Sequence, residues 1–123
     1  MTLKEMNALR VSPLEEQIHL GTLRRLECME RDALALSDSP LRDGLLRQLR
    51  QQLAETTLQL HNLQHRKEQL QRVIDAAPDD YLRGILRGRY EEKLTWEEIA
   101  LRLCGENSCS AKKRVQRFLE TLP

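Results

Sequence analysis

The sequence predicts an all-α protein: an N-terminal antiparallel helical hairpin with a coiled-coil-like pattern, then a three-helix helix-turn-helix unit. Two observations support this fold class. Leu, Arg, Gln and Glu dominate the 123 residues, and all four are good helix formers. Aromatic residues make up 3% of the chain, and runs of strand-forming residues are scarce. We expect residues 1–77 to form the hairpin scaffold and residues 78–123 the helix-turn-helix unit.

The scaffold begins with two predicted helix starts. A short helix runs from a Thr2 cap to Val11. Its apolar side chains recur at helical spacing: Leu3, Met6 and Leu9. Ser12 and Glu15 then match a capping box around Pro13, and proline suits the first position of a helix. A second helix is therefore expected to begin at Pro13.

The second helix, from Pro13 to Leu36, has an apolar stripe that indicates burial on one side. The stripe comprises Leu14, Ile18, Leu23, Leu26, Met29, Ala33 and Leu36. After a break at residues 37–39, Pro40 starts a third helix with a heptad seam of about four repeats. The seam comprises Leu46, Leu49, Leu53, Thr56, Leu60, Leu63, Lys67, Leu70 and Ile74. Because such a seam needs cover, the short break makes the second helix its antiparallel neighbour.

The two hairpin helices differ in length. The second spans about 24 residues and the third about 37, so the third extends beyond its neighbour by roughly 20 Å. Either the helix from Thr2 to Val11 folds back over this excess, or a second chain covers it. We expect the first for the fold, together with a homodimer formed through the hairpin.

Residues 78–123 carry a second set of caps. Asp79 can cap a helix from Asp80 to Tyr90. The apolar side chains of this helix form one wall of a core: Tyr81, Leu82, Ile85 and Leu86. Thr95 and Glu98 match a capping box that opens the next helix. Its apolar stripe is Ile99, Ala100 and Leu103.

The last predicted helix follows a turn at residues 104–107. Gly105 and Asn107 tolerate the positive φ of a turn, and Ser108 can cap a helix that extends to Leu122. One face of this helix is apolar: Ala111, Val115, Phe118, Leu119 and Leu122. The opposite face comprises Cys109, Lys113, Gln116 and Arg117, flanked by Lys112 and Arg114. Glu120 is the one acidic residue of this basic helix. The basic side chains must therefore face either an anionic partner or solvent.

Charge is unevenly distributed along the chain. From Tyr81 onward, nine Lys and Arg residues oppose six Asp and Glu residues, whereas residues 1–80 carry eleven against thirteen. The basic end is the candidate for nucleic-acid binding. Because the excess is modest, we expect moderate affinity that depends strongly on salt.

Three segments resemble region four of primary sigma factors: Asp80–Tyr90 (DYLRGILRGRY), Leu94–Ala100 (LTWEEIA) and the basic helix. The chain is closer still to small phage and prophage transcriptional regulators that carry a sigma-like C-terminus behind a helical hairpin. The sigma-like pattern covers roughly the last third of the chain. The resemblance implies a regulator whose last helix enters the major groove of double-stranded DNA, with RNA polymerase as a candidate partner.

The resemblance also assigns site residues. The base-facing residues would be Cys109, Lys113, Gln116 and Arg117. The phosphate contacts would be Thr95, Arg102, Ser108, Ser110, Lys112 and Arg114. The turn at residues 104–107 is longer than the Gly-x-Ser turn of sigma factors. We therefore assign a face of the helix rather than a single base-reading residue.

A second hypothesis comes from another functional class. The chain could be a coiled-coil adaptor that docks on a protein such as RNA polymerase and binds little DNA itself. DNA binding through several phosphate contacts should weaken steeply as salt rises, whereas an apolar helix-in-groove contact should not.

Under the DNA-binding hypothesis, a dimer would present two recognition helices to a two-fold operator, and a monomer only one.

The sequence has no pattern of an enzyme or a metal site. It lacks a glycine-rich phosphate loop, paired carboxylates in an apolar setting and a nucleophile beside its base. His61 and His65 have no further ligand beside them, and Cys104 and Cys109 lack a second pair. We expect no cofactor. The odd cysteine count, including Cys28, and the lack of a signal sequence or a long apolar run predict a cytoplasmic protein with reduced thiols and no membrane contact.

Overall fold

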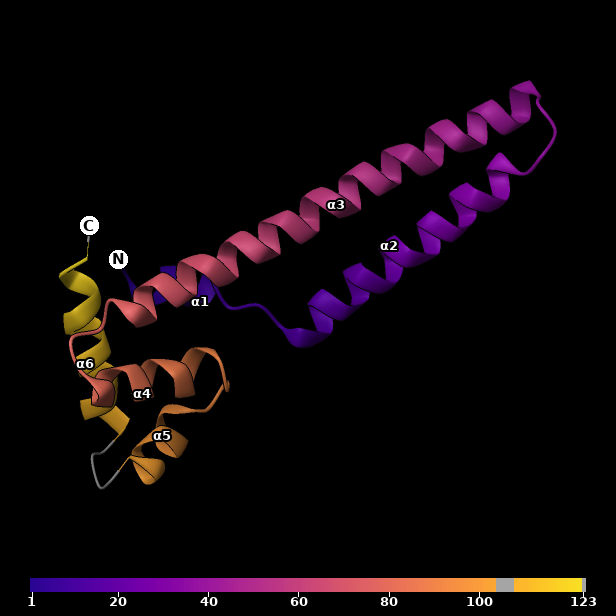
Figure 1. Ribbon diagram of the computed structural model, residues 1–123. Coiled ribbons are helices and arrows are strands. Elements are labelled where there is room, and N and C mark those ends of the chain that lie inside the picture. Colours follow the sequence, from indigo (N-terminus) through magenta and orange to yellow (C-terminus); the bar gives the residue numbers. More distant parts are fainter. Residues whose placement is uncertain (104–107, 123) are drawn as a thin grey trace. The chain divides into compact units, whose positions relative to one another are not determined.

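The computed structural model describes residues 1–103 and 108–122 (Figure 1). Regular structure in these residues is entirely helical, which confirms the predicted all-α class. The helices are α1 (Leu3–Ala8), α2 (Pro13–Leu34), α3 (Pro40–Asp75), α4 (Asp80–Tyr90), α5 (Trp96–Arg102) and α6 (Ser108–Glu120). None of the described helices combines the length and the apolarity that a membrane span requires.

Internal packing divides the chain into two compact units. The hairpin unit is Val11–His65, and the C-terminal unit comprises Met1–Arg10 and Arg66–Pro123. Helix α3 contributes residues to both units. The expected domain division into residues 1–77 and 78–123 stays a prediction.

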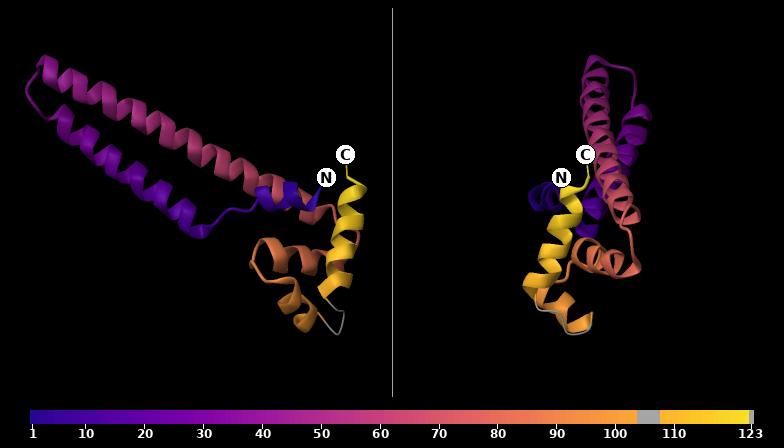
Figure 2. Two further views of the ribbon diagram at one scale, coloured as in Figure 1. Left: turned by 180° about the vertical axis from the view of Figure 1, so that it is seen from behind. Right: turned by 90° about the vertical axis from the view of Figure 1, so that its left-hand side faces the viewer.

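In the hairpin unit, α2 and the first part of α3 lie antiparallel and are joined by the segment 35–39 (Figure 1, Figure 2). The buried core comprises Leu26, Ala33, Leu46 and Leu49, with Leu53 packed against it. The Arg42 guanidinium pairs with Asp38 at 2.9 Å and donates to the Ala33 carbonyl at 3.3 Å. Ser39 accepts the Arg42 N–H at 3.1 Å. These bonds hold the turn, and the predicted start of α3 at Pro40 is confirmed.

The predicted stripe of α2 is wrong in part. Leu26 and Ala33 are buried and Leu23 is half-buried. Four other members are exposed: Leu14, Ile18, Met29 and Leu36. The stripe spreads around too much of the helix circumference for one neighbour to cover all of it. Leu36 also lies beyond the helix, which ends at Leu34.

The capping box predicted at Ser12 is wrong. Ser12 occupies the N-cap position but makes no side-chain cap bond. Pro13 has no N–H, so one fewer unpaired donor needs a partner at this helix start.

The predicted seam of α3 is mostly confirmed. Its buried members are Leu46, Leu49, Thr56, Leu63, Leu70 and Ile74. Leu53 and Leu60 are half-buried, and Lys67 is exposed. The seam is therefore interrupted at Lys67.

The C-terminal unit is built around one core that joins the two ends of the chain. The core comprises Met6, Leu70, Ile74, Ala77, Leu82, Ile85, Leu86, Tyr90, Ile99, Ala111, Val115, Phe118 and Leu119. Met6 of α1 is fully buried in it, and α1 lies beside the C-terminal end of α3 (Figure 1, Figure 2). The prediction that the first helix covers the end of α3 is confirmed. That helix stops at Ala8, however, rather than at Val11.

The cap residues of the C-terminal unit act as predicted. Asp79 accepts the Leu82 N–H at 2.7 Å, and the Thr95–Glu98 capping box is complete. Helix α6 ends at Glu120 rather than at Leu122. There the Thr121 hydroxyl donates to the Phe118 carbonyl at 2.6 Å and closes the helix end. The predicted turn at residues 104–107 and the side chain of Ser108 lie outside the described residues.

Candidate nucleic-acid interface

Helix α6 divides sharply into a buried and an exposed face. Val115 and Leu119 are fully buried, and Ala111 and Phe118 are nearly so. These four residues recur at three- and four-residue spacing, so they lie on one face and fix the rotation of α6 in the core. The opposite face is consequently presented outward over the described length of the helix.

All four residues predicted to face DNA bases are on the outward face. Cys109, Lys113, Gln116 and Arg117 are exposed. Within residues 1–103 and 108–122, none of their side chains makes an intramolecular hydrogen bond or ion pair. Their donors and charges are therefore available to an external partner.

Glu120 is exposed on the same outward face, two turns beyond Lys113. A carboxylate there repels phosphate groups. Its position favours contact of an anionic partner with the N-terminal half of α6.

The residues predicted to contact phosphate have different surroundings. Lys112 is exposed, and the Arg114 guanidinium lies over the Tyr81 ring at 5.1 Å. Arg102 pairs with Glu92 at 3.0 Å, so a phosphate would have to compete with this carboxylate. Ser110 is half-buried and has an intramolecular partner.

Thr95, another predicted phosphate contact, is occupied by its role as a cap. Its hydroxyl accepts the Glu98 N–H at 3.2 Å and donates to the Glu98 carboxylate at 3.1 Å. The structure thus brings Lys112 and Arg114 to the flanks of the outward face. Arg114, like Thr95 and Arg102, already has a partner in the fold.

The connection between α4 and α5 sets the position of α5. Arg89 donates to the Leu94 carbonyl at 3.1 Å, and its guanidinium lies over the Trp96 ring at 4.9 Å. Lys93 takes φ 60, a backbone conformation that costs a non-glycine residue free energy. Trp96 therefore belongs to the internal support of the unit.

Tyr90, the last residue of α4, lies in the core of the C-terminal unit. Its side chain is buried, and within the described residues its hydroxyl has no hydrogen-bond partner. Burial raises the pKa of the Tyr90 hydroxyl, against the smaller opposing effect of the Arg89 and Arg10 charges. Tyr90 is a packing residue and lies off the outward face of α6.

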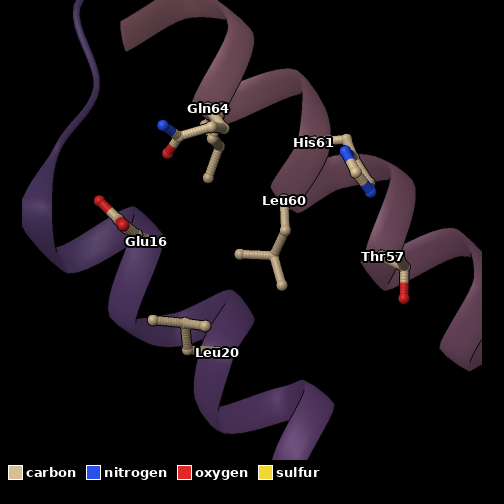
Figure 3. Close-up of a pocket in the computed structure, with 7 residues that line it drawn as sticks. Glu16, Leu20, Thr57, Leu60, His61 and Gln64 are labelled. Carbon is tan, nitrogen blue, oxygen red and sulfur yellow. The ribbon is translucent and has the colours of Figure 1, made fainter.

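The hairpin unit contains a hollow of about 360 Å³ between α2 and α3 (Figure 3). Leu20 and Leu60 extend toward each other across it, and Glu16 and Gln64 lie at one end (Figure 3). His61 lines the hollow from α3 and is exposed. This arrangement is a gap in the packing of the two hairpin helices.

The described thiols and histidines form no cluster that could hold a metal ion. Cys28 and Cys109 are free and exposed. In residues 1–103 and 108–122, no three His, Cys, Asp or Glu side chains approach one another closely enough to hold a metal ion.

Comparisons of the chain with protein-family models, with curated proteins and with solved structures returned no match.

Proposed function

We propose that the protein is a sequence-specific DNA-binding regulator of transcription, of the phage or prophage type, with α6 as its recognition helix. One observation carries the proposal. Helix α6 buries its apolar face in a capped helix-turn-helix core and leaves Lys113, Gln116 and Arg117 outward, without intramolecular partners among the described residues. A helix presented in this way fits the width of the major groove.

The side chains suggest a division of roles. Arg117 and Lys113 suit the O6 and N7 acceptors of guanine, and Gln116 suits the edge of adenine. Lys112 and Arg114, on the flanks, are suited to phosphates and would set the orientation of the helix. Cys109 lies one turn before Lys113, and its small side chain would face the groove at the N-terminal end of α6.

Two partners belong to the same proposal. RNA polymerase is a partner by the resemblance to sigma region four, and a second copy of the chain is a partner through the hairpin unit. Exposed leucines support protein contact by the hairpin: Leu41 is 85% exposed and Leu58 is 61% exposed. A dimer would match a two-fold operator.

The adaptor hypothesis is favoured by a specific feature of α5. Leu101 is 84% exposed in the helix that precedes the recognition helix. An apolar side chain at this position suits a protein partner better than phosphate. Under this alternative, binding to the partner would persist at salt concentrations that abolish DNA binding.

The proposal is tested by a double variant, Lys113→Ala with Arg117→Ala, on a duplex recovered by selection from genomic fragments. Its specific affinity should fall at least about thirtyfold, because each of the two base contacts is worth roughly 1–3 kcal/mol. The matched control is Arg24→Ala with Arg47→Ala, which removes the same charge from exposed positions of α2 and α3. An equal loss in both variants, or no loss in the first, would contradict the assigned face.

A further inference from the structure

Helix α2 carries a second row of residues, the outer stripe, about a quarter turn around the helix from its buried residues Leu26 and Ala33. Its members follow one another at three- and four-residue steps, and all are exposed: Leu14, Ile18, Gly21, Arg25, Met29 and Asp32. This spacing is that of a heptad seam, the pattern by which one helix packs on another. The opposite flank of α2 is already in use, because Glu16 lines the hollow and Glu30 pairs with Arg50 of α3 at 3.3 Å.

The apolar members of the outer stripe face solvent in the single chain. Leu14, Ile18 and Met29 are each at least 44% exposed. Leu36 follows at the turn end of the hairpin and is exposed too. Apolar side chains that recur along one exposed face of a helix indicate contact with another helix.

Gly21 leaves a gap near the middle of the outer stripe. A glycine inside a helix costs stability relative to alanine. A Cβ atom added at Gly21 would meet nothing within 4 Å among the described residues, so the packing of the hairpin unit does not require glycine there. A helix of a second molecule that approaches α2 closely would require it, because only glycine leaves room above the backbone.

Two opposite charges lie one heptad apart in the outer stripe. Arg25 and Asp32 are exposed, and neither side chain makes a hydrogen bond or an ion pair within residues 1–103 and 108–122. They are about 10 Å apart along the helix axis, which is too far for an ion pair within α2. The two charges are therefore complementary to a second outer stripe that runs in the opposite direction.

We propose that the outer stripe is the homodimer interface, in which the α2 helices of two copies pack antiparallel about a two-fold axis. The inference rests on the proposed function in one respect, since the second copy is the partner named there. Every pairing in a two-fold contact occurs twice. Arg25 of each copy would pair with Asp32 of the other. Met29 would then pack beside Met29 of the second copy near the axis, and Leu36 would lie over Gly21 of the second copy.

The charges disfavour a parallel arrangement of the two helices. Parallel α2 helices related by a two-fold axis would place Arg25 beside Arg25 and Asp32 beside Asp32, and both contacts are repulsive. The antiparallel arrangement turns the same four charges into two attractive pairs. The dimer would carry two copies of α6, so a two-fold operator would bind more tightly than a single half-site.

Charge reversal in the full chain tests the interface without DNA. Arg25→Asp would place two aspartates together at each pairing, and Asp32→Arg would place two arginines together. Each variant should weaken self-association at least about tenfold in sedimentation velocity measured over a range of concentrations. Because both positions are exposed, circular dichroism should show unchanged helix content. The matched control is Arg24→Asp, which makes the same change of charge off the outer stripe and should associate like the wild type.

Two restorations decide the direction of the helices. The double variant, Arg25→Asp with Asp32→Arg, exchanges the two charges, so it should associate as tightly as the wild type. An equimolar mixture of the two single variants should also form dimers of wild-type affinity, because both pairings are again between opposite charges. Single variants that associate like the wild type, together with a mixture that associates more tightly, would indicate parallel helices and overturn the proposal.

Two further outcomes would also overturn the proposed interface. One is a wild type that stays monomeric at about 100 μM, and the other is a double variant that associates no better than the single variants. None of these measurements involves DNA. If no duplex is recovered by selection, the proposed function fails, while the sedimentation measurements still decide the interface.

Discussion

The two units of the protein use similar helices but pack them differently. The C-terminal unit joins α1, the end of α3 and α4 to α6 around one core. The hairpin unit has a small core, a hollow of about 360 Å³ and exposed leucines such as Leu41 and Leu58. The difference shows that two antiparallel helices alone cannot cover all their apolar side chains. Several helices packed around one core can cover them.

This comparison has a functional meaning. The rigidity needed to present side chains to a groove comes from buried contacts, and these are concentrated beneath α6. The hairpin, with fewer such contacts, leaves leucines such as Leu41 exposed, and under the proposed function these would contact a protein partner.

The first prediction compares a leucine of the C-terminal core with a leucine that lines the hollow of the hairpin unit. Leu119→Ala should lower the free energy of unfolding by about 3–4 kcal/mol, because Leu119 is fully buried. Leu60→Ala should cost about 1 kcal/mol, because Leu60 is half-buried and already borders a hollow. Urea unfolding followed by circular dichroism measures both. Equal losses would remove the contrast between the units.

The second prediction concerns helix caps. Asp79→Ala should destabilise the protein by about 1 kcal/mol, since the carboxylate accepts the Leu82 N–H at 2.7 Å. Ser12→Ala is the control, because Ser12 makes no side-chain cap bond. Its free energy of unfolding should stay within about 0.5 kcal/mol of the wild type. A larger loss at Ser12 than at Asp79 would contradict the cap assignments.

The third prediction concerns backbone strain between α4 and α5. Lys93→Gly should raise the free energy of unfolding by about 1 kcal/mol, because Lys93 has φ 60 and glycine adopts this conformation without a Cβ clash. Lys67→Gly, at an exposed position inside α3, should lower it by about 1 kcal/mol. The two lysine variants should therefore have shifts of opposite sign in urea unfolding.

The fourth prediction concerns pH. Burial raises the pKa of the Tyr90 hydroxyl, so the folded state holds this proton more tightly than the unfolded chain does. Its contribution to stability is present below the unfolded pKa, about 10, and is lost as pH rises through the higher folded pKa. Tyr90→Phe should remove this alkaline loss.

At neutral pH, Tyr90→Phe should leave the free energy of unfolding unchanged or raise it by up to about 1 kcal/mol. The variant removes a buried hydroxyl that has no partner among the described residues. Urea unfolding of the wild type and the variant at neutral pH and above pH ~10 provides the measurement. A marked loss in the variant at neutral pH would indicate an undetected partner of the hydroxyl.

Local sequence signals predicted the helix starts well. Proline at Pro13 and Pro40, and the caps Asp79 and Thr95, act within one helical turn, so neighbouring residues contain the information. Helix ends were less accurate at Ala8, Leu34 and Glu120. At these positions each helix ends in turn hydrogen bonds that several neighbouring residues could make equally well.

Long-range packing was harder to predict. Periodicity identified the outward face of α6, because the buried face of Val115 and Leu119 repeats clearly. It could not show that Arg102 pairs with Glu92, in the connection between α4 and α5, or that Arg114 lies over Tyr81 of another helix. The same limit explains the α2 stripe, where apolar residues such as Ile18 stay largely exposed.

The most direct test of the central claim is a selection of genomic fragments with the purified chain at about physiological salt. It is followed by titration of the recovered sequence against a scrambled duplex. A recovered motif bound about a thousandfold more tightly than the scramble, with affinity that falls steeply as salt rises, is the predicted result. Weak binding without enrichment of any motif would contradict the claim and favour a protein partner.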